Sequence, residues 1–166
     1  GGRRGSVQRQ QKLLVLTARL VQRVTSERAT TLGPITVATT RQTAILPATV
    51  TYVVDLSKLK AADLQWNPEA QLLSVRRPPV EPMPASIEWA NAQTFQDNGW
   101  QTVLTDVSAN LKRDNEAKAP GQFAAQARAR DLIAMADHAA DQALETTFRM
   151  PLVVAGYADA KVAVSR

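Results

Sequence analysis

VTYVVDLSKLKAADLQWNPEAQLLSVRRPPVEP, residues 50–82, is the stretch that decides the fold of this chain. It opens with the alternating side chains of a strand, which run into the element Asp55-Leu56-Ser57-Lys58-Leu59. The turn signal Asn67-Pro68 then separates two short apolar segments, which predict strands over 64–66 and 71–77. Four prolines in residues 78–84 predict an extended exit from the second of these strands.

Upstream of this stretch, the sequence has the β-branched and alternating composition of strands. Residues 12–25 predict a first strand, and Gly33-Pro34 predicts the turn that follows it. Residues 35–46 and 48–55 predict a second and a third strand. We expect Pro47 to separate them, because a proline cannot donate to the hydrogen-bond ladder of a central strand.

From Ser86 onward, the apolar period changes to that of helices. Ser86 is expected to cap a short helix through Trp89 that Asn98-Gly99 ends. Asp106 is expected to cap a second helix, which Pro120-Gly121 ends or kinks.

An alanine-rich segment, residues 122–148, predicts the longest helix, which Met150-Pro151 should end. Alanines recur there at steps of four and three and form one face on which only Leu132 projects: Ala125, Ala129, Leu132, Ala136, Ala139 and Ala143. We expect the domain's own sheet to approach this face closely, with another copy of the helix as the alternative. Residues 152–164 predict the last strand, with Gly156 as a candidate bulge.

Strands first, helices next and one closing strand predict the α+β class. We expect a mainly antiparallel sheet with an Ala-rich long helix and shorter helices packed on one side of it. Residues 12–164 are expected to form a single α+β domain, which suits a chain of 166 residues. Residues 1–11 are expected to be a disordered basic arm that follows a removed membrane span.

The basic charge of the chain gathers near its N-terminus. Residues 1–28 hold seven Lys and Arg residues against Glu27 alone, whereas the remainder is close to neutral. Lys and Arg cluster beside membrane spans, so this arm indicates a tether or contact with a membrane surface. We expect no nucleic-acid partner, because the basic run has no interleaved aromatic residue. No apolar run is long enough to span a membrane.

Candidate chemical groups are few. The chain has no cysteine and only one histidine, which excludes thiolate chemistry, Cys-ligated metals and a site with several histidines in one chain. His138 has Asp141 three residues later, but no nucleophile motif accompanies the pair, so we expect a surface histidine. Asp55 and Asp63 are too few for an oxygen cage, and Asp55 is expected to cap its turn. The sequence therefore predicts no catalytic, cofactor-binding or metal-binding residue, and no cofactor.

Two further groups leave alternatives open. Arg76-Arg77 could clamp an anionic ligand, but we expect one arginine on each side of the strand end, in solvent. Trp66, Trp89 and Trp100 could line a pocket, but a lone tryptophan in each segment is typical of a core filler or a lid.

The chain resembles the bacterial domain-of-unknown-function family 4230. The likeness covers residues 12–164 and rests on Val54-Asp55-Leu56-Ser57-Lys58-Leu59, on Ser74 to Pro82, on the helix from Gln122 and on the closing strand. Two positions depart from the family pattern, since Arg77 replaces the usual leucine and Pro82 the usual isoleucine. The resemblance implies a domain preceded by one membrane span, with no established activity. A fainter likeness of pattern is to stomatin- and prohibitin-like scaffold domains.

These observations predict a non-enzymatic interaction domain that is extracytoplasmic or membrane-tethered. The expected partners are a membrane surface, through the basic arm, and a protein partner or weak self-association. The alternative is a small-ligand or lipid-binding domain with a pocket between sheet and helices. A hydrolase is the third reading, and it needs a nucleophile that the sequence does not show. We expect the protein to be membrane-anchored, with the extracytoplasmic side favoured.

Overall fold

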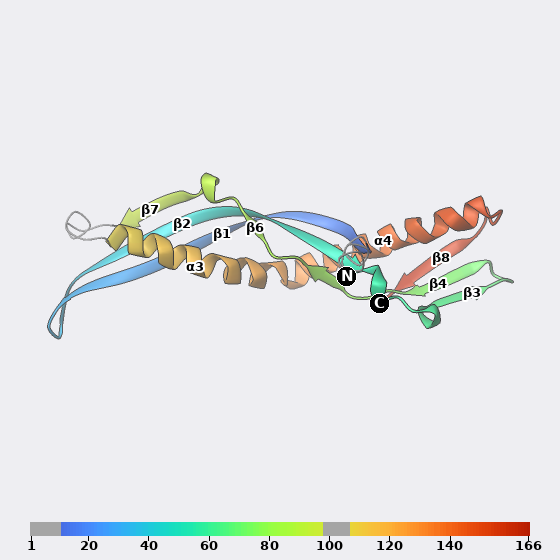
Figure 1. Cartoon of the computed structure of the whole chain (residues 1–166), viewed down its shortest axis with the longest axis horizontal. Coiled ribbons are helices and arrows are strands. Elements are labelled where there is room, and N and C mark those ends of the chain that lie inside the picture. The colour runs from blue at the N-terminus through green and yellow to red at the C-terminus, as the bar shows by residue number, and fades with distance from the viewer. Residues whose placement is uncertain (1–10, 98–106) are drawn as a thin grey trace, which may run out of the picture. The chain divides into compact units, whose positions relative to one another are not determined.

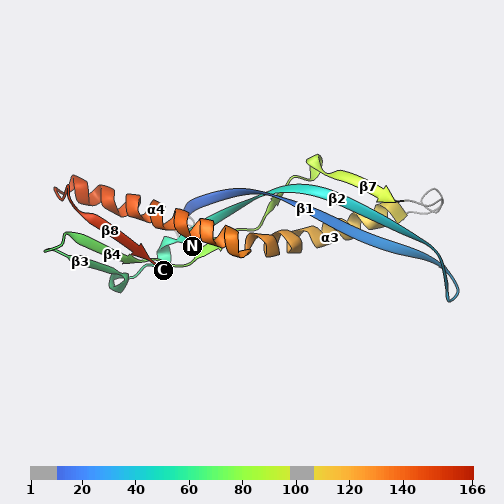
Figure 2. The same ribbon diagram turned by 180° about the vertical axis from the view of Figure 1, so that it is seen from behind.

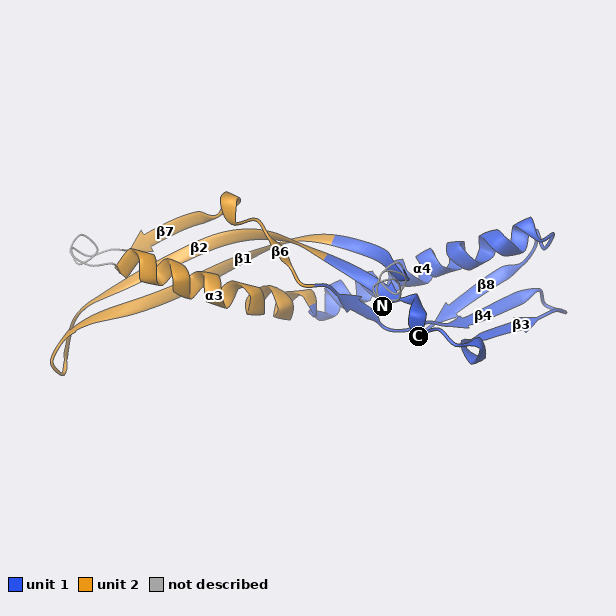
Figure 3. Ribbon diagram, viewed as in Figure 1, with its two compact units in different colours: residues 1–17, 51–83, 128–166 blue, residues 18–50, 84–127 orange. Residues whose placement is uncertain are grey.

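The computed structural model describes residues 11–97 and 107–166 (Figure 1). The chain groups into two compact units, shown in Figure 3. Unit 1 comprises 51–83, 128–166 and the described part of 1–17. Unit 2 comprises 18–50 and the described part of 84–127. The predicted arm falls almost entirely outside the described residues, and the single domain over 12–164 stays a prediction.

A long antiparallel hairpin begins the fold. Strands β1 (Lys12–Leu32) and β2 (Ile35–Asp55) meet at the predicted Gly33-Pro34 turn, where Gly33 has a φ of 60°. The first strand is therefore confirmed, and it is longer than predicted. Along β2 the even-numbered residues from Thr40 to Val54 are buried, whereas most odd-numbered ones are half-buried. This alternation gives the hairpin one face toward the interior.

The expected break at Pro47 is wrong, because β2 continues through it. The main-chain carbonyl of Pro47 accepts a hydrogen bond from the Glu88 amide at 2.9 Å. The N and O of one residue point to the same side of an antiparallel strand, so the missing N–H also faces that side. On that side the partner pairs with β2 through Ile45 and again from Ala48, so the proline falls between the two paired segments.

Short strands complete the sheet of the hairpin. Strands β5 (Val80–Pro82), β6 (Ser86–Ile87) and β7 (Gln93–Asp97) all pair antiparallel with β2. The helix predicted from Ser86 is therefore wrong, apart from one 3-10 turn, η3 (Trp89–Asn91). The open edge of β2 offers backbone partners to this segment, and the long-range ladder overrides its local helical pattern. The expected stop at Asn98-Gly99 lies outside the described residues.

A second, three-stranded sheet lies in unit 1. Strands β3 (Leu64–Asn67) and β4 (Leu72–Arg76) form the predicted antiparallel pair, and β8 (Lys161–Ser165) pairs with β4 in parallel. Two 3-10 turns, η1 (Leu56–Lys58) and η2 (Ala61–Asp63), precede β3. The last strand is shorter than the predicted 152–164.

The two long helices differ from the predicted ones at their ends. Helix α3 (Val107–Ala127) continues through Pro120, and α4 (Arg130–Val154) continues through Pro151. Both prolines are exposed, and so are Glu116 and Thr147, the residues four positions earlier whose carbonyls lose their N–H donors, so water can replace the lost hydrogen bonds. The prediction of one helix over 122–148 is therefore wrong, because the helical conformation is interrupted between Ala127, where α3 ends, and Arg130, where α4 begins. Helix α4 ends at Val154, and Gly156 follows its C-cap residue Ala155 with a φ of 103°, as is common after a helix C-terminus, so the expected bulge there is also wrong.

The helices bury stripes of every fourth residue rather than the predicted alanine face. The buried positions are Leu111, Asn115, Ala119, Phe123 and Ala127 on α3, and Ala136, Ala140 and Leu144 on α4. Ala125 and Ala129 are exposed, so only Ala136 of the predicted face is fully buried. In unit 2, α3 runs beside the hairpin in both Figure 1 and Figure 2. In unit 1, α4 packs on β8 and β5, so the domain's own sheets take its buried face. The α+β class, with mainly antiparallel sheets and two long helices packed against them, is confirmed.

Candidate functional site

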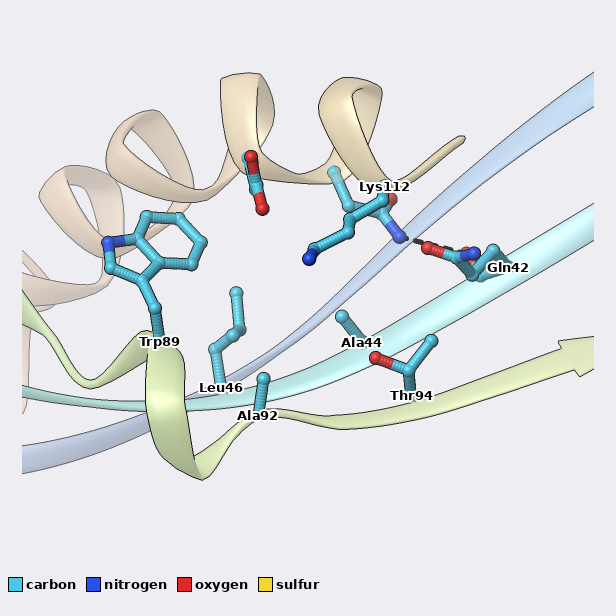
Figure 4. Close-up of a pocket in the computed structure, with 9 residues that line it drawn as sticks. Gln42, Ala44, Leu46, Trp89, Ala92, Thr94 and Lys112 are labelled. Carbon is cyan, nitrogen blue, oxygen red and sulfur yellow. Dashed lines mark hydrogen bonds between the residues drawn. The ribbon is translucent and has the colours of Figure 1, made fainter. Parts of the chain in front are cut away.

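A small cavity of about 90 Å³ lies inside unit 2, between β2, α3 and the segment from η3 to β7 (Figure 4). Each of these three elements contributes three lining residues: Gln42, Ala44 and Leu46; Trp89, Ala92 and Thr94; and Lys112, Asn115 and Glu116. Trp89 and Gln42 lie at opposite ends of the cavity, and the Lys112 side chain extends between them. The cavity therefore has an aromatic end, a polar end and a charged helix above it.

Asn115 is the polar residue buried deepest in this site. It interrupts the apolar stripe of α3 and is 2% exposed. Its Nδ2 donates to the main-chain carbonyl of Gln42 at 3.2 Å, which fixes the orientation of the amide. Its Oδ1 is buried and has no hydrogen-bond partner in the part of the chain that the structure describes. An unsatisfied buried acceptor costs about 1–3 kcal/mol, so this oxygen calls for a donor.

Gln42 is held rigidly at the polar end of the cavity. Its Nε2 donates to Gln96 Oε1 at 2.9 Å and to the Ser108 carbonyl at 3.3 Å. Gln96 in turn donates to the Ser108 hydroxyl at 2.9 Å. These bonds join β2, β7 and α3 and hold the polar end of the cavity in place. The Asn115 amide cannot turn over, because its Oδ1 would then lie against the carbonyl oxygen of Gln42.

Lys112 and Glu116 add opposite charges to the lining. They lie one turn apart on α3, and both are exposed. Neither side chain makes a hydrogen bond or an ion pair within residues 11–97 and 107–166. The lysine precedes the glutamate, which is the less favourable order for an ion pair along a helix. Trp89 is 45% exposed, and the buried side chain of Leu46 lies below it.

Arg77 forms a second polar cluster, inside unit 1. Its side chain is 2% exposed, and it donates to Asp141 Oδ1 at 2.6 Å and to Asp137 Oδ1 at 2.9 Å. It also donates to the carbonyl of Pro78 at 3.1 Å. The expectation that both arginines lie in solvent is therefore wrong for Arg77. The adjoining depression is lined by Arg76, Arg77 and Lys58, among others. The guanidinium of Arg77 is already bound by two carboxylates, so it is not free to clamp an anion.

The other predicted residues occupy structural positions. His138 is exposed on α4, as expected. Asp55 caps η1, since its Oδ1 accepts from the Ser57 hydroxyl at 2.5 Å and from the Ser57 amide at 3.1 Å. The hydroxyl contact above all lowers the pKa of Asp55. Asp63 caps η2 by accepting from the Lys60 amide. No group of three or more His, Asp or Glu residues that could hold a metal ion occurs among the described residues.

The tryptophans divide between two environments. Trp66 meets Tyr157 edge to face, with ring centroids 5.4 Å apart, in unit 1. Trp89 lines the cavity, which is the outcome that favours the ligand-binding alternative, and Trp100 lies outside the described residues. Sequence reasoning missed Lys112, Asn115 and Glu116. The signal that could have found them is Asn115, a polar residue within the stripe of every fourth residue that is otherwise Leu, Ala, Phe and Ala.

A family model described as "Protein of unknown function (DUF4230)" matches residues 5–162. The chain belongs to the DUF4230 family. Comparison with curated proteins and with solved structures found no match. The resemblance inferred from the Asp55–Leu59 element and the proline-rich turn is thus confirmed, whereas the likeness to stomatin- and prohibitin-like scaffolds stays a prediction.

The two DUF4230 elements that carry this resemblance are both built into unit 1. The Asp55 element is the capped turn η1, and the turn after β4 begins with the buried Arg77. Among the described residues of this DUF4230 chain, no helix is long and apolar enough to cross a membrane.

Proposed function

We propose that this DUF4230 chain is the folded part of a membrane-anchored, extracytoplasmic interaction domain. It acts through protein contacts rather than catalysis, and the end of the β1–β2 hairpin is the contact surface. The observation that carries this proposal is the exposed, apolar hairpin end. Leu32 is 70% exposed, Ile35 is 64% exposed and Val37 is 43% exposed.

Apart from the ion pair of Arg28 with Asp114 on α3, the side chains of the hairpin end make no hydrogen bond or ion pair with another element among the described residues. From Glu27 to Val37 every residue is exposed except the half-buried Thr30. In both views of the chain, the turn extends past the first turn of α3 within unit 2 (Figures 1 and 2). A two-stranded ribbon is only marginally stable in water, so a ribbon tipped with three large apolar residues suits a surface that a partner covers.

The anchor is supported by the charge distribution. Seven basic residues against one acidic residue in positions 1–28 match the clusters of Lys and Arg that flank membrane spans. The rest of the chain has no comparable excess of either sign.

Site-specific photocrosslinking in native membranes tests the contact surface. A benzophenone amino acid at Ile35 should give a discrete protein adduct at wild-type expression. The same probe at Val21, an exposed residue of β1 far from the turn, is the matched control and should not. Equal adducts at both positions, or none at Ile35 and Leu32, would refute the proposal.

The side of the membrane is tested by labelling, because the chain has no cysteine and gives a clean background. A cysteine at the exposed Ala125 should react with a membrane-impermeant maleimide in intact cells. Labelling only after lysis would place the domain on the cytoplasmic side.

A second candidate function is the binding of a small ligand. The cavity lined by Asn115 favours it, because this cavity combines a polar end held by hydrogen bonds with an aromatic wall.

A further inference from the structure

We infer that a second copy of this chain pairs with the open edge of β2 next to the hairpin turn, strand to strand and antiparallel about Val37, so that two hairpins form one continuous sheet. The inference rests on the proposed contact surface at the hairpin end, and it names the partner and the mode of binding. Three features support it: a free main-chain edge, the absence of charge along that edge, and a strand that complements itself.

The main chain of β2 has an open edge beside the turn. Strand β7 pairs with residues 41–45 of β2 and reaches no further, and both views show it stopping short of the turn (Figures 1 and 2). The Pro47 carbonyl points to the side of β6 and β7, so every second residue before it has its N–H and C=O on that side too. Among the described residues, these main-chain groups have no partner at three positions: Ile35, Val37 and Thr39.

The two long edges of the hairpin are protected differently. On β1, the Lys118 ammonium donates to the Thr25 carbonyl at 3.0 Å. Charged side chains also recur along β1: Arg19, Arg23, Glu27 and Arg28. A lysine or other charge on an edge strand discourages pairing with another chain.

The free part of β2 has no such protection. Residues 29–40 carry no charge, and residues 35–39, Ile-Thr-Val-Ala-Thr, are mostly β-branched and include no proline or glycine. Alternating donors and acceptors along an edge are matched as a set only by another extended strand. The chain therefore protects β1 and leaves this stretch of β2 open to a strand.

Antiparallel pairing about Val37 fits a second copy to this edge. Val37 pairs with Val37 of the second copy, and Ile35 pairs with Thr39 in both directions, so each pair exchanges two main-chain hydrogen bonds. The ladder uses the free positions and stops where β7 begins. Directly opposed residues share a face, so valine meets valine and isoleucine meets threonine, and no charge meets its own sign. The two-fold contact also covers both open edges at once, which one foreign strand would not do.

The contact is small. Stable interfaces use about 20–30 residues on each side, whereas this ladder uses a short stretch of one strand. We therefore expect weak pairing in solution that becomes stronger when two chains share a membrane, because a common tether raises their effective concentration.

Single cysteines in the whole chain test the register, because the chain has none of its own. Val37→Cys should give a covalent dimer on mild oxidation, since hydrogen-bonded partners lie about 5.5 Å apart at Cα, within disulfide range. Ile35→Cys and Thr39→Cys should each stay monomeric alone, because equivalent residues would be displaced by about 13 Å along the strands. A mixture of these two variants should form the dimer. Leu32→Cys, at the 70% exposed residue of the turn, is the control for random collision and should stay monomeric.

A proline on the edge tests whether the main chain carries the contact. Thr39→Pro removes an edge donor without touching the β1–β2 ladder, as β2 already shows at Pro47, whose missing N–H faces the same side. Added to Val37→Cys, it should slow disulfide formation at least about tenfold. Thr39→Val keeps the N–H and is the matched control, which should cross-link as fast as Val37→Cys alone. Circular dichroism checks that both variants are folded.

The outcomes separate this inference from the proposed contact surface. Leu32→Cys dimers as abundant as Val37→Cys dimers, or a Val37→Cys dimer indifferent to Thr39→Pro, would overturn the edge pairing. No Val37→Cys dimer, with a photoadduct of Ile35 to a different protein in native membranes, would overturn the second copy and leave the contact surface standing. A photoadduct of Ile35 to the chain itself supports both. No photoadduct at the turn, or one with lipid alone, would refute both.

Discussion

The Arg77 cluster allows a quantitative test of which buried charge the fold depends on. The perturbation is the pair of variants Arg77→Met and Asp137→Ala/Asp141→Ala, which remove opposite sides of one ion-pair cluster. The side chain of Arg77 is 2% exposed, whereas those of Asp137 and Asp141 are 24% and 43% exposed. The two sides of the cluster therefore differ in how well water can replace the lost partner.

Removing the carboxylates leaves a buried cation with main-chain carbonyls alone. Loss of one side of a buried pair costs about 3–5 kcal/mol, and we expect the double alanine variant to fall in this range. Removing the arginine leaves two carboxylates that reach solvent, one of which still lies 3.5 Å from Arg166. Because methionine also keeps much of the buried volume, we expect Arg77→Met to cost only about 1–2 kcal/mol.

Urea unfolding followed by far-UV circular dichroism measures both changes, with equal m-values as the check that the unfolded states are alike. The triple variant completes the cycle. Adding Arg77→Met to the double alanine background should restore stability, because it removes the stranded cation. The reasoning is refuted if the triple variant is less stable than the double variant, or if Arg77→Met alone costs more than the loss of both carboxylates.

Three further outcomes are expected. Ala136→Arg should unfold the chain, seen as loss of the far-UV circular dichroism transition, because Ala136 is fully buried and the arginine would have no partner; a folded variant would mean that this face is open. Gly33→Ala should lower stability by about 1 kcal/mol in a thermal melt through its positive φ alone, since a Cβ there meets no atom within 4 Å, and Gly33→Asn should lower it less. The hydrogen bond from Arg28 lowers the pKa of Asp114 in the folded chain. The stability that this ion pair contributes should therefore be present above about pH 4 and be lost as the pH falls through the lowered pKa. Melting temperatures of wild type and Arg28→Gln should then converge in acid, and a constant difference would contradict this.

The sequence predicted the elements whose signals are local. The Gly33-Pro34 turn, the strands about Asn67-Pro68 and the cap of Asp55 each depend on neighbours within a few residues, and all three are found. The α+β class followed from the order of these elements. What a local pattern could not give was the length of β1 and β2, because two pairing strands continue as long as their ladder does.

The prolines show why the remaining boundaries were missed. A strand tolerates a proline where its missing N–H would have had no partner. Inside a helix, a proline always leaves the carbonyl four residues earlier without its donor, and an exposed position lets water replace that donor. Pro47 lies between two paired segments of the neighbouring strands, and Pro120 and Pro151 lie on exposed helix surfaces. These facts depend on partners distant in the sequence, so each proline looked like an end and was not one.

Arg77 was misplaced for a related reason. From the sequence it is one of two adjacent charges at a strand end, where alternation sends at least one into solvent. Its burial requires both Asp137 and Asp141, which lie 60 and 64 residues away on α4.

The position of the cavity follows from two stripes that are polar at the same place. The buried residues of β2 alternate at steps of two, and those of α3 recur at steps of four, which turns the stripe slowly around the helix and suits packing on a twisted ribbon. The β2 stripe is apolar from Ala44 onward and polar before it, and the α3 stripe is polar only at Asn115. The structure brings Gln42 and Asn115 together, so that this polar pair lies next to Ala44, where the apolar part of the β2 stripe begins. A leucine at position 115 would continue the stripe without an unsatisfied oxygen. The asparagine therefore lowers the stability that this interior could reach, by the cost of about 1–3 kcal/mol that one unsatisfied buried acceptor carries.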